Sequence, residues 1–170
     1  VWTLHDGWAY TGHCAFYDYT GCRGFESGCY KCTEYQKVYP YALFRNRTKE
    51  NYIRKKEAFT NVLDLTIVTP SSWLAREVKK SFLREYPIKV IPNGVDREIF
   101  CPREGALREN MGLLQKFVIL GVANVWERRK GLSYFIELSE RLSKEYQIVL
   151  IGLSKKQLRG LRGNITGLSR

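Results

Sequence analysis

Short apolar segments alternate with helical periodicity along most of this chain, and this alternation restricts the fold more than any other feature of the sequence. The apolar runs are typical of buried strands, and they lie at 65–69, 88–91, 117–123 and 147–152. Apolar residues with helical spacing lie between them, at 52–63, 72–82 and 132–142. Because parallel neighbouring strands need a crossover helix, the pattern predicts an α/β fold with parallel sheets.

Two lobes are predicted, separated by a segment with little periodicity. The strand at 88–91 ends in a Pro-Asn-Gly turn, because proline stops a strand and Asn-Gly tolerates positive φ. Charged residues and glycines then dominate 96–114, as in a crossing between two lobes. We therefore expect one domain at 1–104 and a second at 105–170.

The chain begins and ends like an internal fragment of a longer protein. Its first four residues form a strand-like run with no methionine before it. After the strand at 147–152, a basic stretch closes on Arg170 without a clear final element. We therefore expect further sequence on both sides.

The net charge favours an anionic partner. Twenty-eight Lys and Arg against 17 Asp and Glu give a formal net charge of +11. Such a charge attracts nucleic acids, phosphorylated small molecules or an acidic membrane surface, and charge alone does not separate these classes. The hydrophobic content of 44% excludes a disordered or collagen-like chain. No apolar run reaches the roughly 18 residues of a spanning helix, so we expect a cytoplasmic protein, with a peripheral position on the inner face of the plasma membrane left open.

Four cysteines cluster in a segment, 7–35, that has no regular periodicity. They follow the pattern C-x7-C-x6-C-x2-C, at Cys14, Cys22, Cys29 and Cys32. In a reducing compartment such a cluster is more typical of metal ligands than of disulfides, and the C-x2-C pair has the usual chelating spacing for zinc. The spacing predicts a structural zinc ion that orders the segment. The alternative is that the thiols are buried as small hydrophobic groups.

A cationic loop joins the strand at 117–123 to the helix that follows it. Arg128, Arg129 and Lys130 precede Gly131, at the carboxyl end of a strand, where ligands bind in open α/β sheets. Cations at a helix N-terminus are unfavourable unless an anion is bound there, because the helix dipole is positive at that end. The loop therefore predicts a diphosphate site. The alternative is a solvated charged loop.

Several segments occur in an order that resembles one known family. They are TLHDGWAYTGHC, VTPSSWLAREVKKSFL, IKVIPNGVDREIFCP and ILGVANVWERRKGL followed by FIELS. This combination is similar to the family 4 glycosyltransferases of the GT-B fold that build bacterial exopolysaccharides. The resemblance implies two Rossmann-like domains that face each other across a cleft. It also implies that this chain carries the second half of the acceptor-side domain and only the start of the donor-side domain.

The resemblance implies roles for the loop and for the Asn-Gly turn. In such enzymes a basic pair after the first donor-domain strand holds the diphosphate of a nucleotide sugar. Lys130 matches the lysine, and Arg129, or else Arg128, takes the place of the arginine. Asn93 and Gly94 match the interdomain loop whose backbone lines the cleft, although a simple turn explains them equally well.

His5 is similar in position to the histidine that these enzymes place near the sugar and the acceptor. At the carboxyl end of a strand it is placed to hydrogen-bond a sugar hydroxyl or to assist charge at the reacting oxygen, as a catalytic residue. Asp6 is a candidate to orient it, and His13 is a weaker candidate for a functional histidine. The alternative is that His5 is a satisfied structural residue.

The acidic E-x7-E motif of the family's donor domain is matched only in spacing, by Glu137 and Glu145. These residues lack the Phe-Gly that follows the first glutamate in the family, and they come several elements too early. We interpret them as solvated helix charges. The true motif and most of the nucleotide-base pocket are therefore expected outside this chain.

The leading hypothesis is part of a retaining hexosyltransferase of polysaccharide biosynthesis, inactive as this chain alone. It would move a sugar from a nucleotide-diphosphate sugar to a lipid-linked or saccharide acceptor. The basic run at 45–56 would contact anionic lipid headgroups or a lipid-diphosphate acceptor, unless it only coats a helix. A zinc-stabilised nucleic-acid-binding module is the second hypothesis, because cysteines, basic charge and aromatic residues suit it, but it leaves the βαβ units unexplained. An inactive truncated remnant is the third.

Overall fold

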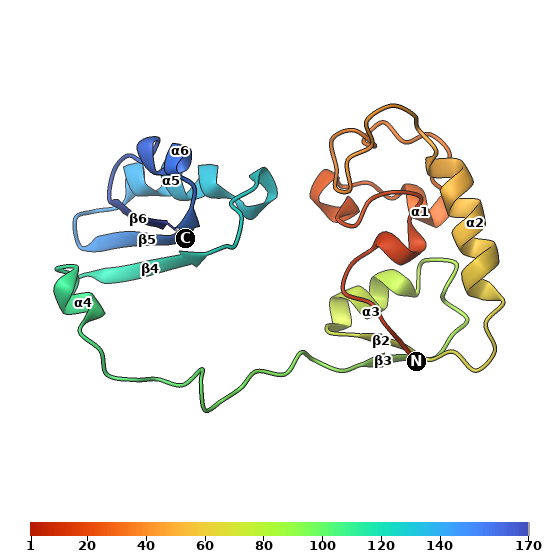
Figure 1. Cartoon of the computed structure of the whole chain (residues 1–170), viewed down its shortest axis with the longest axis horizontal. Coiled ribbons are helices and arrows are strands. Elements are labelled where there is room, and N and C mark those ends of the chain that lie inside the picture. The colour runs from red at the N-terminus through yellow and green to blue at the C-terminus, as the bar shows by residue number, and fades with distance from the viewer. Residues whose placement is uncertain (170) are drawn as a thin grey trace. The chain divides into compact units, whose positions relative to one another are not determined.

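The computed structural model describes residues 1–169 and divides into two compact units, Val1–Ile99 and Phe100–Arg170. Each unit is built on a small three-stranded parallel sheet (Figure 1). The predicted α/β class with parallel sheets is thereby confirmed. The assignment of residues 1–104 and 105–170 to acceptor-side and donor-side domains stays a prediction, and Arg170 lies outside the described residues.

The first unit combines a parallel sheet with a long, largely irregular segment. Its elements are β1 (Trp2–Thr3), η1 (Trp8–Tyr10), η2 (Tyr17–Thr20), α1 (Gly24–Ser27), α2 (Thr48–Thr60), β2 (Ile67–Thr69), α3 (Ser72–Val78) and β3 (Ile88–Val90). The strand order is β1-β2-β3, and β2 is buried along its whole length. The Ser71 hydroxyl accepts a hydrogen bond from the Leu74 backbone N–H at 3.2 Å. This cap starts α3 because it satisfies an amide that has no partner within the helix.

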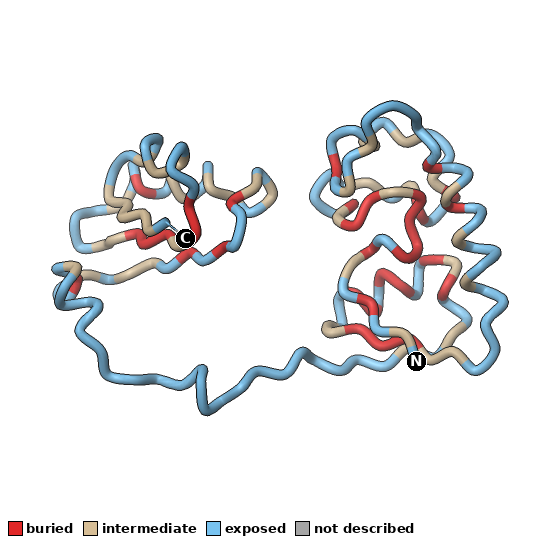
Figure 2. Tube along the Cα trace, viewed as in Figure 1, coloured by how far each residue is buried: buried red, intermediate tan, exposed pale blue. Residues whose placement is uncertain are grey.

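The second unit repeats the strand and helix alternation. Its elements are α4 (Leu107–Asn110), β4 (Phe117–Val122), η3 (Arg128–Lys130), α5 (Leu132–Arg141), β5 (Tyr146–Leu153), α6 (Lys155–Arg159) and β6 (Ile165–Ser169). The strand order is β4-β5-β6, with Phe117 opposite Tyr146 at the start of the first pairing. In the first unit, buried positions lie on β2, on α3 and throughout residues 4–17, and in the second unit they concentrate on β5 (Figure 2). The strands expected at 117–123 and 147–152 are confirmed as β4 and β5.

The helix expected at 52–63 begins and ends earlier than its periodicity suggests. It spans Thr48–Thr60, and Leu63, expected on its apolar face, is 89% exposed. The helix stops because side chains of its last turn bond to its own carbonyls. The Thr60 hydroxyl donates to the Lys56 carbonyl at 2.6 Å, and the Asn61 amide donates to the Glu57 carbonyl at 2.9 Å. Side chains that compete for backbone partners favour helix ends over helix interiors.

The end of the chain is regular, so the expectation of no clear final element was wrong. Ser154 and Gln157 form a capping box, in which each side chain bonds the backbone of the other residue. This arrangement starts α6, and β6 then pairs with β5, with Ile165 opposite Ile148. The Ser-x-x-Gln pattern after a strand was visible in the sequence and predicts such a helix start.

The irregular segment is packed around aromatic rings and contains short helical turns. The ring of Phe25 lies 5.2 Å from that of Tyr10 and 4.6 Å from that of Tyr17, measured between centroids. The Tyr52 hydroxyl of α2 donates to the Phe25 carbonyl at 3.0 Å. These contacts attach the segment to α2 through a buried core.

A second attachment runs through the buried carboxylate of Glu77 on α3. This carboxylate accepts hydrogen bonds from the Tyr17 hydroxyl at 2.9 Å, from Lys80 Nζ at 2.6 Å and from the Arg23 guanidinium. Burial by itself raises the pKa of Glu77, but the hydrogen bonds from Lys80, Tyr17 and Arg23 outweigh it and hold the pKa below the ordinary 4.5. The cysteine-rich segment is thus attached to α3 through an ionised group.

Replacing this charge should weaken the fold in a pH-dependent manner. We expect Glu77→Gln to lower the free energy of unfolding by about 2 kcal/mol at neutral pH, because a buried donor set loses its charged acceptor. Because the pKa of Glu77 is lower in the folded than in the unfolded state, its ionised carboxylate stabilises the fold at pH values above the unfolded-state pKa. The difference in unfolding free energy between wild type and Glu77→Gln should therefore shrink as the pH falls below about 4. Equilibrium urea unfolding at several pH values measures this. Glu85→Gln is the control, because Glu85 pairs with Arg84 at the surface, and its effect should stay below about 0.5 kcal/mol. Equal effects of both substitutions would contradict the prediction.

Candidate functional site

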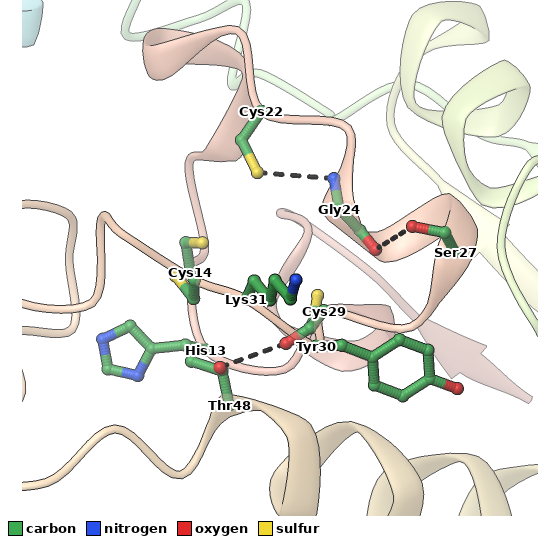
Figure 3. A pocket seen from close by; sticks show the side chains of 10 residues that line it. His13, Cys14, Cys22, Gly24, Ser27, Cys29, Tyr30, Lys31 and Thr48 are labelled. Atoms are coloured by element: carbon green, nitrogen blue, oxygen red, sulfur yellow. Dashed lines mark hydrogen bonds between the residues drawn. The ribbon is translucent and has the colours of Figure 1, made fainter.

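The four clustered cysteines surround one cavity in the first unit. The cavity has a volume of about 350 Å³, and its lining includes Cys14, Cys22, Cys29 and Cys32. The sulfur atoms of the first three face the same space in Figure 3. The sequence spacing thus brings all four residues to one place, although they come from separate turns of the segment. We call this space the cysteine cavity.

Burial holds these thiols in the protonated form. It raises the pKa of Cys14 to about 12 and that of Cys29 to about 11, and repulsion between neighbouring thiolates adds to the shift. Burial likewise raises the pKa of Cys32. Burial also lowers the pKa of Lys55, beside Cys29 and Cys14, to about 8. Ionising several of these thiols together therefore requires a compensating positive charge.

The cysteine thiols are not gathered tightly enough to hold an ion as they stand. Within residues 1–169, no group of three or more His, Cys, Asp or Glu side chains has an arrangement that holds a metal. All five cysteines are free thiols, and Cys101 is exposed and outside the cavity. The zinc expected from the spacing therefore stays a prediction.

His13 borders the cysteine cavity but its ring points away from the sulfur atoms (Figure 3). Its Nε2 atom is buried and has no hydrogen-bond partner in the described part of the chain. Desolvation lowers the pKa of His13, and the carbonyls of Tyr35 and Pro40 oppose that shift. The orientation indicates a neutral structural histidine at the edge of the cavity.

His5 and the Asn-Gly turn lie at the same edge of the first sheet. The Leu4 backbone N–H donates to the Val68 carbonyl at 2.8 Å. This bond extends the pairing of β1 with β2, so His5 lies just past the carboxyl end of β1. Asn93 and Gly94 follow β3 in the same way. All three are exposed. The Asp6 carboxylate accepts the Trp8 backbone N–H at 2.8 Å and so fixes the turn after His5.

The cationic loop of the second unit has a rigid base. Trp126 is buried, its indole N–H donates to the Ile151 carbonyl at 2.9 Å, and its carbonyl accepts from the Gln157 amide at 2.8 Å. Gly131 ends the loop with a φ of 76°, a left-handed conformation that favours glycine. The backbone between these two residues is therefore fixed at the carboxyl end of β4.

The three cations of this loop differ in exposure. Arg128 and Lys130 are exposed, whereas the side chain of Arg129 is 27% exposed and lies 3.5 Å from the Glu127 carboxylate. Arg129, the favoured arginine from the sequence, is thus the one held against an acidic neighbour. Arg128 and Lys130 are the more accessible to an anion.

A further cavity lies beside this loop, and the sequence analysis did not identify its residues. It measures about 460 Å³ and is lined from the loop by Trp126 and from the end of β5 by Gly152, Ser154 and Lys155. The Ser-x-x-Gln capping box at Ser154 is the sequence pattern that could have located this cavity, because it marks a helix start at the carboxyl end of a strand. The loop cations are not among the residues that line this cavity, so they form the candidate anion site of the second unit and the cavity is a neighbouring space.

A search against protein-family models found no match. Over 98 residues, however, the chain is 35% identical to an Escherichia coli K12 protein named "Putative colanic acid biosynthesis glycosyl transferase WcaC". The chain is partly homologous to this glycosyltransferase. The resemblance to glycosyltransferases that the motifs predicted is confirmed as partial homology. The aligned segment covers 56% of the chain and 23% of the E. coli transferase, so the chain spans less than a quarter of its relative.

The similarity to the E. coli transferase assigns no role to any of the candidate residues. The roles of His5, Asn93, Gly94 and the loop cations stay predictions. No described helix of the chain has the length and apolar character needed to cross a bilayer.

Proposed function

We propose that the chain is an internal part of a retaining glycosyltransferase of the GT-B fold. The whole enzyme would move a hexose from a nucleotide-diphosphate sugar to a lipid-linked or saccharide acceptor in polysaccharide biosynthesis. The partial homology to the E. coli transferase carries this proposal. Two α/β units with parallel sheets support it, with residues 1–104 as the second half of the acceptor-side domain and 105–170 as the start of the donor-side domain. Because the chain spans only part of its relative's length, we expect complete donor and acceptor sites only in the native-length protein, meaning the whole protein that contains this chain, and we expect this chain alone to be inactive.

The donor diphosphate would bind at the loop before α5. Exposed cations on a rigid backbone at the carboxyl end of a parallel strand suit a diphosphate, because charge-assisted hydrogen bonds form without reorganisation of the loop. Lys130 and Arg128 would contact the phosphate oxygens. Arg129 would join them by exchanging Glu127 for the anion.

The acceptor-side contributions come from the edge of the first sheet. His5 would hydrogen-bond the transferred sugar or the acceptor hydroxyl, and the backbone of Asn93 and Gly94 would line the cleft. Exposure of these residues past the ends of β1 and β3 supports this placement.

A basic hollow at the start of α2 would contact the membrane that carries a lipid-linked acceptor. The hollow measures about 600 Å³ and is lined by Phe44, Arg45, Arg47, Arg54 and two further residues. The Phe44 side chain beside it is 88% exposed. An exposed aromatic ring next to arginines is typical of contact with an anionic membrane surface, because the ring enters the interface while the cations hold headgroup phosphates.

Vesicle binding tests this surface. Phe44→Ser should weaken binding of the native-length protein to phosphatidylglycerol vesicles about fivefold, from the loss of one buried aromatic group at the interface. Leu63→Ser is a matched control, because Leu63 is 89% exposed and lies outside the hollow. Co-sedimentation measures the bound fraction. Equal loss of binding in both variants, or no preference over phosphatidylcholine vesicles, would rule out this surface.

Competition binding separates the proposed function from a nucleic-acid-binding module. The transferase predicts that a UDP- or GDP-sugar binds the native-length protein and that oligonucleotides do not displace it. A nucleic-acid-binding module predicts oligonucleotide affinity that falls steeply between two salt concentrations. The second result, without sugar-nucleotide binding, would overturn the proposed function.

A further inference from the structure

The cysteine cavity combines features that buried, unused thiols do not require. Four cysteines from a segment without strands converge on one space, and three of their sulfur atoms point into it (Figure 3). Cys14 belongs to the buried core of the unit, and Cys22 and Cys29 pack against that core. The same residues also border a cavity of about 350 Å³, which close packing of small hydrophobic groups alone would have filled.

Backbone amides already bind two of the sulfurs. The Gly12 N–H donates to Cys29 Sγ at 3.2 Å, and the Gly24 N–H donates to Cys22 Sγ at 3.4 Å. Such bonds orient a sulfur ligand and stabilise its negative charge. A Cβ atom at Gly24 would lie 3.5 Å from Cys22 Sγ and 4.0 Å from Cys29 Sγ. Both sulfurs therefore lie near Gly24, where the absence of a side chain leaves the space between them open.

The surroundings of the cavity favour a site of net negative charge. Lys55 Nζ is fixed by the carbonyls of Trp8 at 2.6 Å and Thr11 at 3.1 Å. Gly12 follows Thr11 and donates to Cys29, so this cation is held one residue away from an amide that binds a sulfur. A divalent ion with four thiolates carries excess negative charge, which a nearby lysine offsets.

We propose that Cys14, Cys22, Cys29 and Cys32 bind one zinc ion that has a structural role. Each thiol releases its proton to solvent as its sulfur bonds the metal. In the structure the sulfurs line the wall of the cavity without meeting at one point, so they turn inward to reach the Zn–S distance of about 2.3 Å. His13 is not a ligand, because its ring points away from them (Figure 3). The ion takes no part in the chemistry of the proposed glycosyl transfer.

The ion would order more than its own ligands. The Thr48 hydroxyl at the start of α2 donates to the Cys29 carbonyl at 3.1 Å, and the Asn46 amide donates to the Cys32 carbonyl at 2.8 Å. Asn46 and Arg47 line the basic hollow. Zinc binding therefore fixes the backbone that supports the hollow, and its loss would release that backbone.

Metal analysis and cobalt substitution test the proposal. The native-length protein, purified under reducing conditions, should contain about one zinc ion per chain. After removal of zinc, Co²⁺ should produce thiolate-to-metal charge-transfer bands and the intense visible bands of tetrahedral coordination. Cys29→Ser should reduce metal content at least about tenfold. Cys101→Ser is the matched control and should leave it unchanged, because Cys101 lies outside the cavity.

The wild-type measurement alone decides the proposal even where Cys29→Ser fails to fold. Wild-type protein without stoichiometric zinc and without cobalt thiolate bands would overturn it. So would disulfide pairing of the four cysteines in freshly reduced and re-isolated protein, or full metal content in Cys29→Ser. Removal of the ion by a chelator should also lower the unfolding midpoint by at least about 10 °C.

Discussion

Sugar transfer by the native-length protein should fall roughly 100-fold when Lys130 is replaced by alanine, because one charged contact to the leaving diphosphate is worth that much in the transition state. Negative charge grows on the nucleoside diphosphate as the sugar leaves. Lys130 is exposed next to Gly131, on a loop whose backbone is fixed by Trp126. The lysine therefore meets the anion without a large loss of loop entropy.

Release of nucleoside diphosphate under saturating donor measures this effect. Lys144→Ala is the control, because Lys144 is also exposed but precedes β5 and lies at the amino end of the same sheet. It should keep at least half of the wild-type rate if the carboxyl end of the sheet binds the donor. Equal rates for the two variants would place the donor diphosphate elsewhere.

Gly152→Ala should destabilise the second unit by more than about 3 kcal/mol, because the added methyl group meets backbone that cannot move away. Gly152 has a φ of +90°, and a Cβ atom there would lie 1.9 Å from the Ala123 carbonyl oxygen. The Ala123 N–H donates to the Ile151 carbonyl at 3.2 Å. Relief of the clash therefore breaks the pairing of β4 and β5 at the edge that carries the cationic loop.

Urea unfolding together with amide hydrogen exchange in β4 and β5 measures this loss. Gly160→Ala is the matched control, because Gly160 has a φ of −92° and its nearest neighbour to an added Cβ is the Gln157 carbonyl at 3.5 Å. The control should change the free energy of unfolding by less than about 0.5 kcal/mol. If Gly152→Ala had the unfolding free energy and amide exchange of the wild type, the prediction would be contradicted, because the backbone at this position would then have room to relax.

Much of the fold was predictable because apolar runs and helical periodicity mark strands and helices. The strands β4 and β5 lie within two residues of their expected limits, since continuous apolar runs are typical of strands in parallel sheets. Burial differs between the two strands: β5 is buried or half-buried throughout, whereas Phe117, Leu120 and Val122 of β4 are exposed. The limits of α2 were not predictable from periodicity, because capping of its last turn by Thr60 and Asn61 decides where it stops. β6 was missed because its five residues, ITGLS, carry too few apolar side chains to stand out.

The candidate sites were predictable in location but not in detail. Cysteine spacing indicated that four thiols share a site, and the structure brings them to one cavity. The cysteine spacing did not indicate that the backbone N–H groups of Gly12 and Gly24 donate to the sulfurs, since such contacts depend on the conformation of the turns. Likewise, the cations before Gly131 were visible, but the pairing of Arg129 with Glu127 depends on the backbone of one short turn.

The most direct test of the central claim is transfer of a labelled sugar by the native-length protein. Labelled UDP- and GDP-sugars are supplied with lipid-diphosphate saccharide acceptors, and the label in the lipid product is measured with its anomeric configuration. The account predicts a labelled product with the configuration of the donor, formed together with nucleoside diphosphate. Absence of both transfer and donor binding across this panel, in protein that is folded, would contradict it.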